Sequence, residues 1–126
     1  MNRLTRKIKY AALSAVLFFA PIFAAYGHGD AAWIMADPKH MDARGVHCCG
    51  PADCERAPKG AVKVTKDGLF VALTGQTFPF PGEGPQPSGS YDSIDEDFWW
   101  CWAISPGQFP GQPARLRCVF MPGPGV

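Results

Sequence analysis

Proline and glycine together make up a quarter of residues 28–126, where 12 prolines and 13 glycines occur among 99 residues. Both residue types interrupt regular structure, so we expect short elements joined by many turns and no long helices. A disordered chain is the alternative interpretation of such a composition. The five cysteines and the clusters of aromatic residues favour a folded domain instead.

The N-terminal segment has the three parts of a secretory signal peptide. Residues 2–9 carry four positive charges and no negative charge, residues 10–25 are mostly apolar, and small residues then precede His28 at the spacing of a cleavage site. A membrane anchor is the alternative, but spanning a bilayer takes about 20 apolar residues and this run is shorter. We therefore expect cleavage of residues 1–27, which leaves one domain, residues 28–126, that is periplasmic or secreted and has no stable membrane anchor.

Removal of the signal changes the charge of the chain. The whole sequence has 12 Lys and Arg against 11 Asp and Glu, whereas residues 28–126 keep eight of the basic residues and have a net charge of −3. No basic stripe of the kind that binds nucleic acid is present. An exported domain of this size also gains from disulfides, because it buries only a modest part of its surface and folds where disulfides persist.

One short helix is predicted at the start of this domain. Asp30 is a suitable N-cap, residues 31–36 favour helix, and Pro38 would end it. Two turns of helix are not stable in isolation, so we expect Trp33 or Ile34 to dock on a core.

A cysteine-rich loop and a β-hairpin are predicted next. Residues 37–60 are expected to be irregular, with room for one turn of helix around residues 53–56. Strand-forming residues 61–65 and 69–73 flank Lys66-Asp67-Gly68, a pattern typical of a β-hairpin.

The C-terminal part is predicted to be extended as well. Residues 77–80 favour a short edge strand, and residues 81–90, rich in Pro, Gly and Ser, favour an exposed loop. Residues 97–104 and 115–121 predict a second hairpin. The fold class expected is therefore a small β-rich (α+β) domain of antiparallel hairpins with a short N-terminal helix, stapled by disulfides.

The second hairpin is expected to have two different faces, with Cys101 opposite Cys118 in its register. One face would hold Trp99, Cys101 and Ala103 together with Leu116 and Phe120. The other would hold Trp100 and Trp102. If that second face is exposed, these two tryptophans are a candidate binding surface for sugars or peptides; burial in a core is the alternative.

Five cysteines predict two disulfides and one remaining thiol; they are Cys48, Cys49, Cys54, Cys101 and Cys118. Choosing two bonds among five cysteines allows 15 pairings, and the sequence alone does not select one. One arrangement joins Cys101 to Cys118 and closes a local loop in the N-terminal cluster, and another ties that cluster to each terminal strand. Longer loops constrain the unfolded chain more, which favours at least one link from the cluster to the C-terminal hairpin. The odd thiol would be redox-active, metal-binding, a point of dimerisation, or buried and inert.

Three histidines, His28, His40 and His47, suggest a metal site. Cleavage before His28 would join a terminal amine to an imidazole, a compact chelate for copper that His40 or His47 would complete. A zinc site using His40, His47 and cluster cysteines is a second option. Neither has the paired spacing of a zinc finger, and three surface histidines without metal are the alternative.

An acidic turn precedes the tryptophan-rich strand and contains Asp92, Asp95, Glu96 and Asp97. Such carboxylates would hold a hard cation or act in acid–base catalysis, or simply form a solvated turn. No nucleophile elbow, phosphate loop or zinc-protease motif occurs in the sequence.

Several of these residues together resemble a family of small, uncharacterised exported proteins of Gram-negative bacteria. The matching features are Trp33-Ile34, the block from His47 to Cys54, Trp100-Cys101, and the block from Arg117 to Pro122. The resemblance implies a periplasmic location and a common disulfide framework. It implies no activity and no catalytic residue.

The leading functional hypothesis is a non-enzymatic accessory or partner-binding domain, for example a small inhibitor that presents a loop to a periplasmic protein. The second is a copper- or zinc-binding protein that uses His28, His40 and His47. An enzyme of unknown type is less favoured, because no nucleophile–base pair is visible in the sequence. Apart from copper or zinc, no cofactor is expected.

Overall fold

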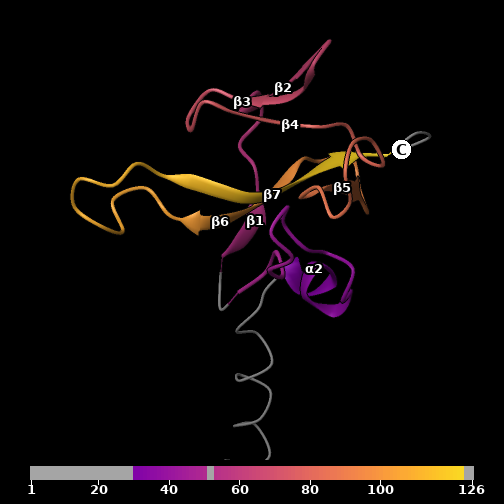
Figure 1. Cartoon of the computed structure of the whole chain (residues 1–126), viewed down its shortest axis with the longest axis horizontal. Coiled ribbons are helices and arrows are strands. Elements are labelled where there is room, and N and C mark those ends of the chain that lie inside the picture. The colour runs from indigo at the N-terminus through magenta and orange to yellow at the C-terminus, as the bar shows by residue number, and fades with distance from the viewer. Residues whose placement is uncertain (1–29, 51–52, 124–126) are drawn as a thin grey trace, which may run out of the picture.

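The computed structural model describes residues 30–50 and 53–123, so the predicted signal peptide and His28 lie outside the described residues. Eight elements are present in these ranges (Figure 1): helix α2 (Ala32–Ala36) and strands β1 (Cys54–Arg56), β2 (Val62–Thr65), β3 (Gly68–Val71), β4 (Gln76–Phe78), β5 (Ser90–Ser93), β6 (Trp99–Ile104) and β7 (Arg115–Pro122). None of the helices in these ranges is long and apolar enough to cross a membrane.

The strands form two sheets. The larger has the order β1-β6-β7-β5, in which β1 and β7 run antiparallel to β6 and β5 runs parallel to β7. The smaller is the antiparallel sheet β2-β3-β4. The prediction of a small β-rich domain with one short helix and two disulfides is therefore confirmed.

The four-stranded sheet is the middle of three layers (Figure 1), with the three-stranded sheet on one side and α2 on the other. Its face toward α2 is built around two cysteines and two large rings, Trp99 and Phe120, which pack with Ile34. Its other face carries Trp100 and Trp102, which pack against buried side chains of the three-stranded sheet. Both faces of the central sheet are thus covered.

The β6–β7 register agrees with the predicted hairpin at Cys101, which pairs with Cys118, and at Trp99, which pairs with Phe120. One part of the prediction is wrong. The register shifts between Cys101 and Trp102, so Leu116 pairs with Trp102 and packs on the opposite face from Trp99. A bulge of this kind is not visible in a period-two pattern, because it adds a residue to one strand only.

The first hairpin is confirmed as well. Thr65 pairs with Gly68, so Lys66 and Asp67 form the two-residue turn. Gly68 has φ of 137°, and a Cβ atom there would lie 2.1 Å from the carbonyl oxygen of Phe78 on the neighbouring strand β4. Only glycine therefore fits this position, where two strands approach closely.

Helix α2 docks on the core as predicted, since Ile34 is fully buried and the Trp33 ring makes edge contacts with Trp99 and Phe120. The predicted N-cap is wrong: Ala31 caps the helix without a side-chain hydrogen bond, and the Asp30 carboxylate instead pairs with Arg56 at 2.8 Å. An ion pair with an arginine takes the carboxylate away from the helix end.

Two strands were not expected. The segment predicted as one turn of helix contains β1, which pairs with β6. The last residue of the predicted exposed loop, Ser90, begins β5, which pairs with β7. Local propensity is weak in both segments, and pairing with strands distant in sequence decides their conformation. Ser90, in β5, is buried, and so is Ser88 just before the strand.

Two disulfides tie the cysteine-rich segment to both strands of the C-terminal hairpin. Cys48 bonds Cys118 across a sequence separation of 70, and Cys54 bonds Cys101 across 47. This is the second of the two arrangements considered from sequence, and it confirms the expected link from the cluster to the hairpin. Cys49 keeps its thiol.

Candidate functional site

A tight loop with an exposed tip connects Met41 and His47 in the cysteine-rich segment. An antiparallel bridge joins Met41 and His47, and the Asp42 amide donates to the Val46 carbonyl at 2.8 Å. All four residues of the tip, 43–46, are exposed. We call residues 42–46 the tip loop.

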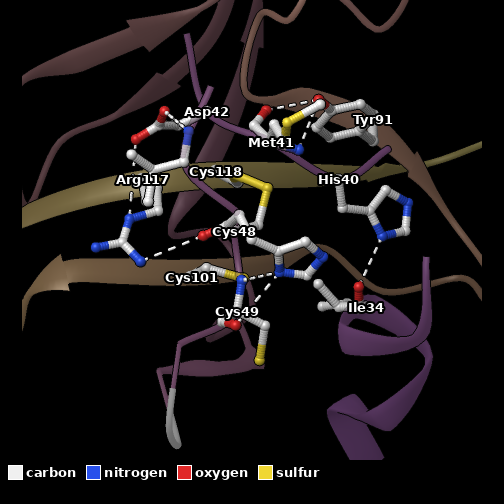
Figure 2. The surroundings of a disulfide bond; sticks show 12 residues. Ile34, His40, Met41, Asp42, Cys48, Cys49, Tyr91, Cys101, Arg117 and Cys118 are labelled. Atoms are coloured by element: carbon white, nitrogen blue, oxygen red, sulfur yellow. Dashed lines mark hydrogen bonds and ion pairs between the residues drawn. A yellow bond between two sulfur atoms is a disulfide. The ribbon is translucent and has the colours of Figure 1, made fainter. Parts of the chain in front are cut away.

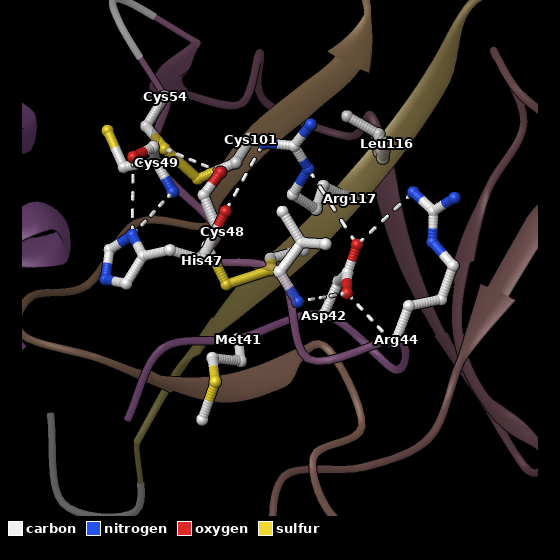
Figure 3. Close-up of polar contacts among 12 residues, drawn as sticks. Met41, Asp42, Arg44, His47, Cys48, Cys49, Cys54, Cys101, Leu116 and Arg117 are labelled. Atoms are coloured by element: carbon white, nitrogen blue, oxygen red, sulfur yellow. Dashed lines mark hydrogen bonds and ion pairs between the residues drawn. A yellow bond between two sulfur atoms is a disulfide. The ribbon is translucent and has the colours of Figure 1, made fainter. Parts of the chain in front are cut away.

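The side chain of Asp42 holds the tip loop from inside. Asp42 is only 5% exposed, and its Oδ1 accepts hydrogen bonds from the backbone amides of Arg44 at 2.9 Å and Val46 at 3.0 Å. Its Oδ2 lies 3.5 Å from Nη2 of Arg44 and 3.8 Å from Nε of Arg117. Figure 3 shows the carboxylate between the two arginines. One buried acid therefore fixes the loop and orients two cations.

The base of the loop is fixed to the central sheet in two ways (Figure 2). The Cys48–Cys118 disulfide joins it to β7. At Met41, the backbone amide donates to the hydroxyl oxygen of Tyr91 on β5 at 2.9 Å, and that hydroxyl donates to the Met41 carbonyl. A covalent bond and two hydrogen bonds thus leave the tip loop little freedom to move against β5 and β7.

A cleft of about 220 Å³ opens between the tip loop and the two sheets. Three arginines line it, Arg44 from the loop and Arg115 and Arg117 from β7, and its apolar walls include Phe78 and Leu116. The cleft was not predicted, because its residues come from five separate parts of the chain: residues 42–44, 76 and 78, 88, 103 and 115–117. We call it the arginine cleft.

Gln76 links the two sheets at the edge of the arginine cleft. Its side-chain amide donates to the Leu116 carbonyl at 3.0 Å and its side-chain carbonyl accepts from the Leu116 amide at 2.7 Å. The side chain therefore makes the two hydrogen bonds that a backbone residue of a neighbouring strand would make. This link keeps β4 beside β7 and holds the cleft walls at a fixed separation.

The structure does not join the predicted metal ligands into a centre. The His40 ring is buried and its Nδ1 lies 3.0 Å from the Ile34 carbonyl oxygen. The His47 ring binds backbone on both sides: its Nε2 contacts the Asp37 carbonyl oxygen at 2.9 Å, and its Nδ1 accepts from the Cys49 amide at 3.2 Å. Within residues 30–50 and 53–123, no group of three or more His, Cys, Asp or Glu side chains is placed to hold a metal ion. His28 lies outside the described residues, so the copper hypothesis stays a prediction.

Cys49 is partly buried, and its backbone amide, not its thiol, contacts Nδ1 of His47. Burial raises the pKa of the Cys49 thiol, and the negative charge of Asp53 raises it further, while backbone hydrogen bonds and Arg117 lower it by less. The thiolate is the nucleophilic form of cysteine. The surroundings therefore favour the protonated, less reactive thiol at neutral pH.

The predicted tryptophan surface is wrong. Trp100 and Trp102 are only 2% and 7% exposed, because the three-stranded sheet covers their face of the central sheet. Both indole N–H groups donate to the same carboxylate oxygen, Oε1 of Glu55. These tryptophans build the core.

The acidic turn is part of an ion-pair network around Arg56. Its guanidinium contacts Asp95 at 3.3 Å and Asp97 at 3.0 Å, and stacks 4.3 Å from the centre of the Trp99 ring. Burial is the largest influence on the Asp95 carboxyl and raises its pKa, but hydrogen bonds and the Arg56 charge outweigh it and lower the pKa overall. The carboxylates of Asp95 and Asp97 thus neutralise an arginine. Asp92 and Glu96 are exposed.

Comparisons with protein-family models, curated proteins and solved structures found no match to this chain. The resemblance to exported Gram-negative proteins therefore stays a prediction.

Proposed function

We propose that this chain is an exported, non-enzymatic domain that binds a partner protein through the tip loop. The observation that carries the proposal is the rigid presentation of an exposed loop on a disulfide-stapled sheet. The tip is 45% exposed at Val46, and the Arg44 side chain is 60% exposed. A basic and an apolar side chain therefore stand next to each other on a fixed support.

Rigidity matters for binding because ordering a flexible loop costs free energy on association. The Asp42 hydrogen bonds and the Cys48–Cys118 disulfide order the tip loop when the domain folds, so binding a partner does not have to order it again. Gly45 has φ of 82°, a left-handed backbone conformation that glycine adopts readily and that closes the turn. No atom lies within 4 Å of the position of a Cβ, so the tip is sterically open at this residue. Small protein inhibitors depend on the same physical principle of preorganisation.

The place of action is proposed to be the periplasm or the external medium. Two disulfides fit an oxidising compartment, where such bonds persist. The signal-like segment at residues 1–27 supports export. Cell fractionation followed by mass spectrometry of the N-terminus tests this part: a mature chain that starts near His28 is expected, and an uncleaved cytoplasmic chain would contradict it.

The expected partner surface combines a carboxylate with an apolar patch, because Arg44 and Val46 present the complementary groups. The test uses the purified oxidised domain to capture proteins from the extracytoplasmic fraction of the source cells, and then repeats binding with the purified partner. Val46→Ser and Arg44→Gln are expected to weaken binding about tenfold each, the usual cost of losing a central contact or a charged hydrogen bond.

The matched control is Val64→Ser, at an apolar residue that is 57% exposed on β2, away from the tip loop. Val64→Ser replaces an exposed valine by serine, as Val46→Ser does, and is expected to leave partner binding unchanged. Equal loss in Val64→Ser and Val46→Ser, or no captured partner in the oxidised protein, would contradict the proposed function.

A further inference from the structure

We propose that the arginine cleft binds a carboxylate group carried on a small apolar body. The inference names the chemical group that the tip-loop face recognises, and to that extent it rests on the proposed function. Its test uses small acids and needs no partner protein. The two proposals can therefore fail separately.

The charge of the cleft is the first argument. Residues 28–126 carry a net charge of −3 and only eight basic residues, yet three of these eight line this one cleft with a single acid, Asp42. That acid accepts from two backbone amides through Oδ1, and its Oδ2 lies 3.5 Å from Arg44 and 3.8 Å from Arg117, so the cleft keeps a net excess of two positive charges. A local excess of positive charge in an acidic domain attracts an anion to this position.

Arg117 is incompletely paired in the cleft wall. Its side chain is only 18% exposed, and its Nη1 donates to the His47 carbonyl at 3.3 Å. Its Nε is buried and has no hydrogen-bond partner among the described residues, since the Asp42 carboxylate is too distant at 3.8 Å. A guanidinium that has lost water without gaining a full ion pair interacts strongly with an added anion. Arginine also matches the planar geometry of a carboxylate.

The apolar wall of the cleft selects the kind of anion. Phe78 and Leu116 line the cleft, and Ala103 lines it from β6. Inorganic phosphate would leave these side chains without contacts, whereas a carboxylate on a short hydrocarbon body would fill the space beside them. The apolar walls therefore favour an organic acid over a simple ion.

The size of the cleft limits the ligand further. Its 220 Å³ corresponds to about seven water molecules. That is below the range of about 300–1,000 Å³ typical of pockets for drug-sized molecules. The ligand is therefore a short-chain acid or the last residue of a peptide with its C-terminal carboxylate.

The experiment follows backbone amide shifts by NMR while oxidised, ¹⁵N-labelled protein is titrated with hexanoate. Saturable shifts are expected at Gln76, Phe78 and Leu116. Hexanol, which lacks the charge, is expected to bind at least about tenfold more weakly, because it loses the charged hydrogen bond. Equal binding of hexanol, or of inorganic phosphate, would overturn the proposal.

Two variants assign the binding to the cleft, with a charge-matched control. Arg115→Gln removes one exposed cation and is expected to weaken hexanoate about tenfold. Ala103→Phe keeps the charge and fills the cleft, so it is expected to abolish binding. Lys63→Gln removes an exposed cation from β2 and is expected to have no effect. If Lys63→Gln and Arg115→Gln weaken binding equally, the attraction is unspecific and the proposal is wrong.

A peptide pair distinguishes the two sources of the carboxylate. An N-acetylated tripeptide ending in leucine is compared with its C-terminal amide and with hexanoate. Tighter binding of the free-acid peptide than of hexanoate supports a protein C-terminus as the natural ligand, and the reverse supports a small organic acid. Equal binding of the peptide acid and its amide would overturn carboxylate recognition. Loss of partner capture with hexanoate binding intact would contradict the proposed function alone.

Discussion

The Glu55 side chain, on the exposed edge strand β1, accepts hydrogen bonds from two buried indoles. The distances to its Oε1 are 3.1 Å from Nε1 of Trp100 and 2.9 Å from Nε1 of Trp102. Buried tryptophans need an acceptor for their N–H groups, since an unsatisfied buried donor costs about 1–3 kcal/mol. One acid at the sheet edge thus permits two polar rings inside the core.

This arrangement predicts a strong effect of a single surface substitution. Glu55→Ala is expected to lower the free energy of unfolding by about 1–3 kcal/mol, because it removes the acceptor of both indole donors. Glu55→Gln keeps a side-chain carbonyl oxygen at the same length and is expected to recover most of the loss. Urea unfolding of both variants measures the difference; equal stability of Glu55→Ala and the natural protein would contradict this role.

At the scale of elements, the cysteine-rich segment has little regular structure and depends on its connections. The Cys48–Cys118 bond holds the tip loop, while the Cys54–Cys101 bond joins residues that are directly opposite on β1 and β6. Both close loops of tens of residues in the unfolded chain, so each is expected to stabilise the fold by about 4 kcal/mol in the chain-entropy model. Their local effects differ.

The two disulfides are therefore expected to be separable by experiment. Replacing Cys48 and Cys118 by alanine should release the tip loop, so that the amides of Gly45 and Val46 exchange hydrogen with solvent faster. Replacing Cys54 and Cys101 should lower global stability by a similar amount but leave exchange at these two amides slow. Hydrogen exchange under native conditions measures this. Equal protection of the tip in both double variants would show that the loop holds itself without its disulfide.

Much of the element pattern could be predicted from sequence where it depends on neighbouring residues. The Lys66–Asp67 turn and the pairing of Cys101 with Cys118 follow from local signals. The strands β1 and β5 could not be predicted, because each forms only by pairing with a distant strand. The burial of Trp100 and Trp102 depends on the position of the smaller sheet, which a strand pattern does not contain.

The arginine cleft was the part of the structure that the sequence predicted least. Asp42, Gln76 and Arg117 are each unremarkable polar residues in the sequence, and they meet only because the tip loop, β4 and β7 come together. The histidines and cysteines, as metal-binding and redox-active residue types, predicted a site that these residues do not form within the described ranges. Most of them turned out to serve hydrogen bonding and cross-linking of the fold.

At the scale of the whole molecule, Arg56 connects the start of the domain to the acidic turn before β6. It pairs with Asp30, Asp95 and Asp97, which gives a network of three carboxylates on one guanidinium. Because these groups are partly exposed, salt screens them and each pair contributes little by itself. Their joint effect is expected to appear in the dependence of stability on pH.

The sign of this effect follows from the lowered pKa of Asp95. A carboxyl whose pKa is lower in the folded than in the unfolded state adds stability at neutral pH and loses it as pH falls below the ordinary value of about 3.9. Asp95→Asn is therefore expected to lower the thermal unfolding temperature at pH 7, with the difference shrinking on acidification. Glu96→Gln, at an exposed acid outside the Arg56 network, is the control. A difference for Asp95→Asn that stays constant down to low pH would contradict this assignment.

The position of Cys49 directly beside Cys48 has a consequence for how the protein reaches its folded state. During oxidation Cys118 can be captured by either neighbour, and five thiols allow 15 two-bond species where four allow three. The Cys49 thiol can also attack a wrong bond and allow it to rearrange. Refolding of the reduced natural protein is therefore expected to pass through scrambled isomers and to profit from an isomerase, whereas Cys49→Ser should give fewer isomers on chromatography. The thiol that is left over in the finished structure is then a participant in its assembly.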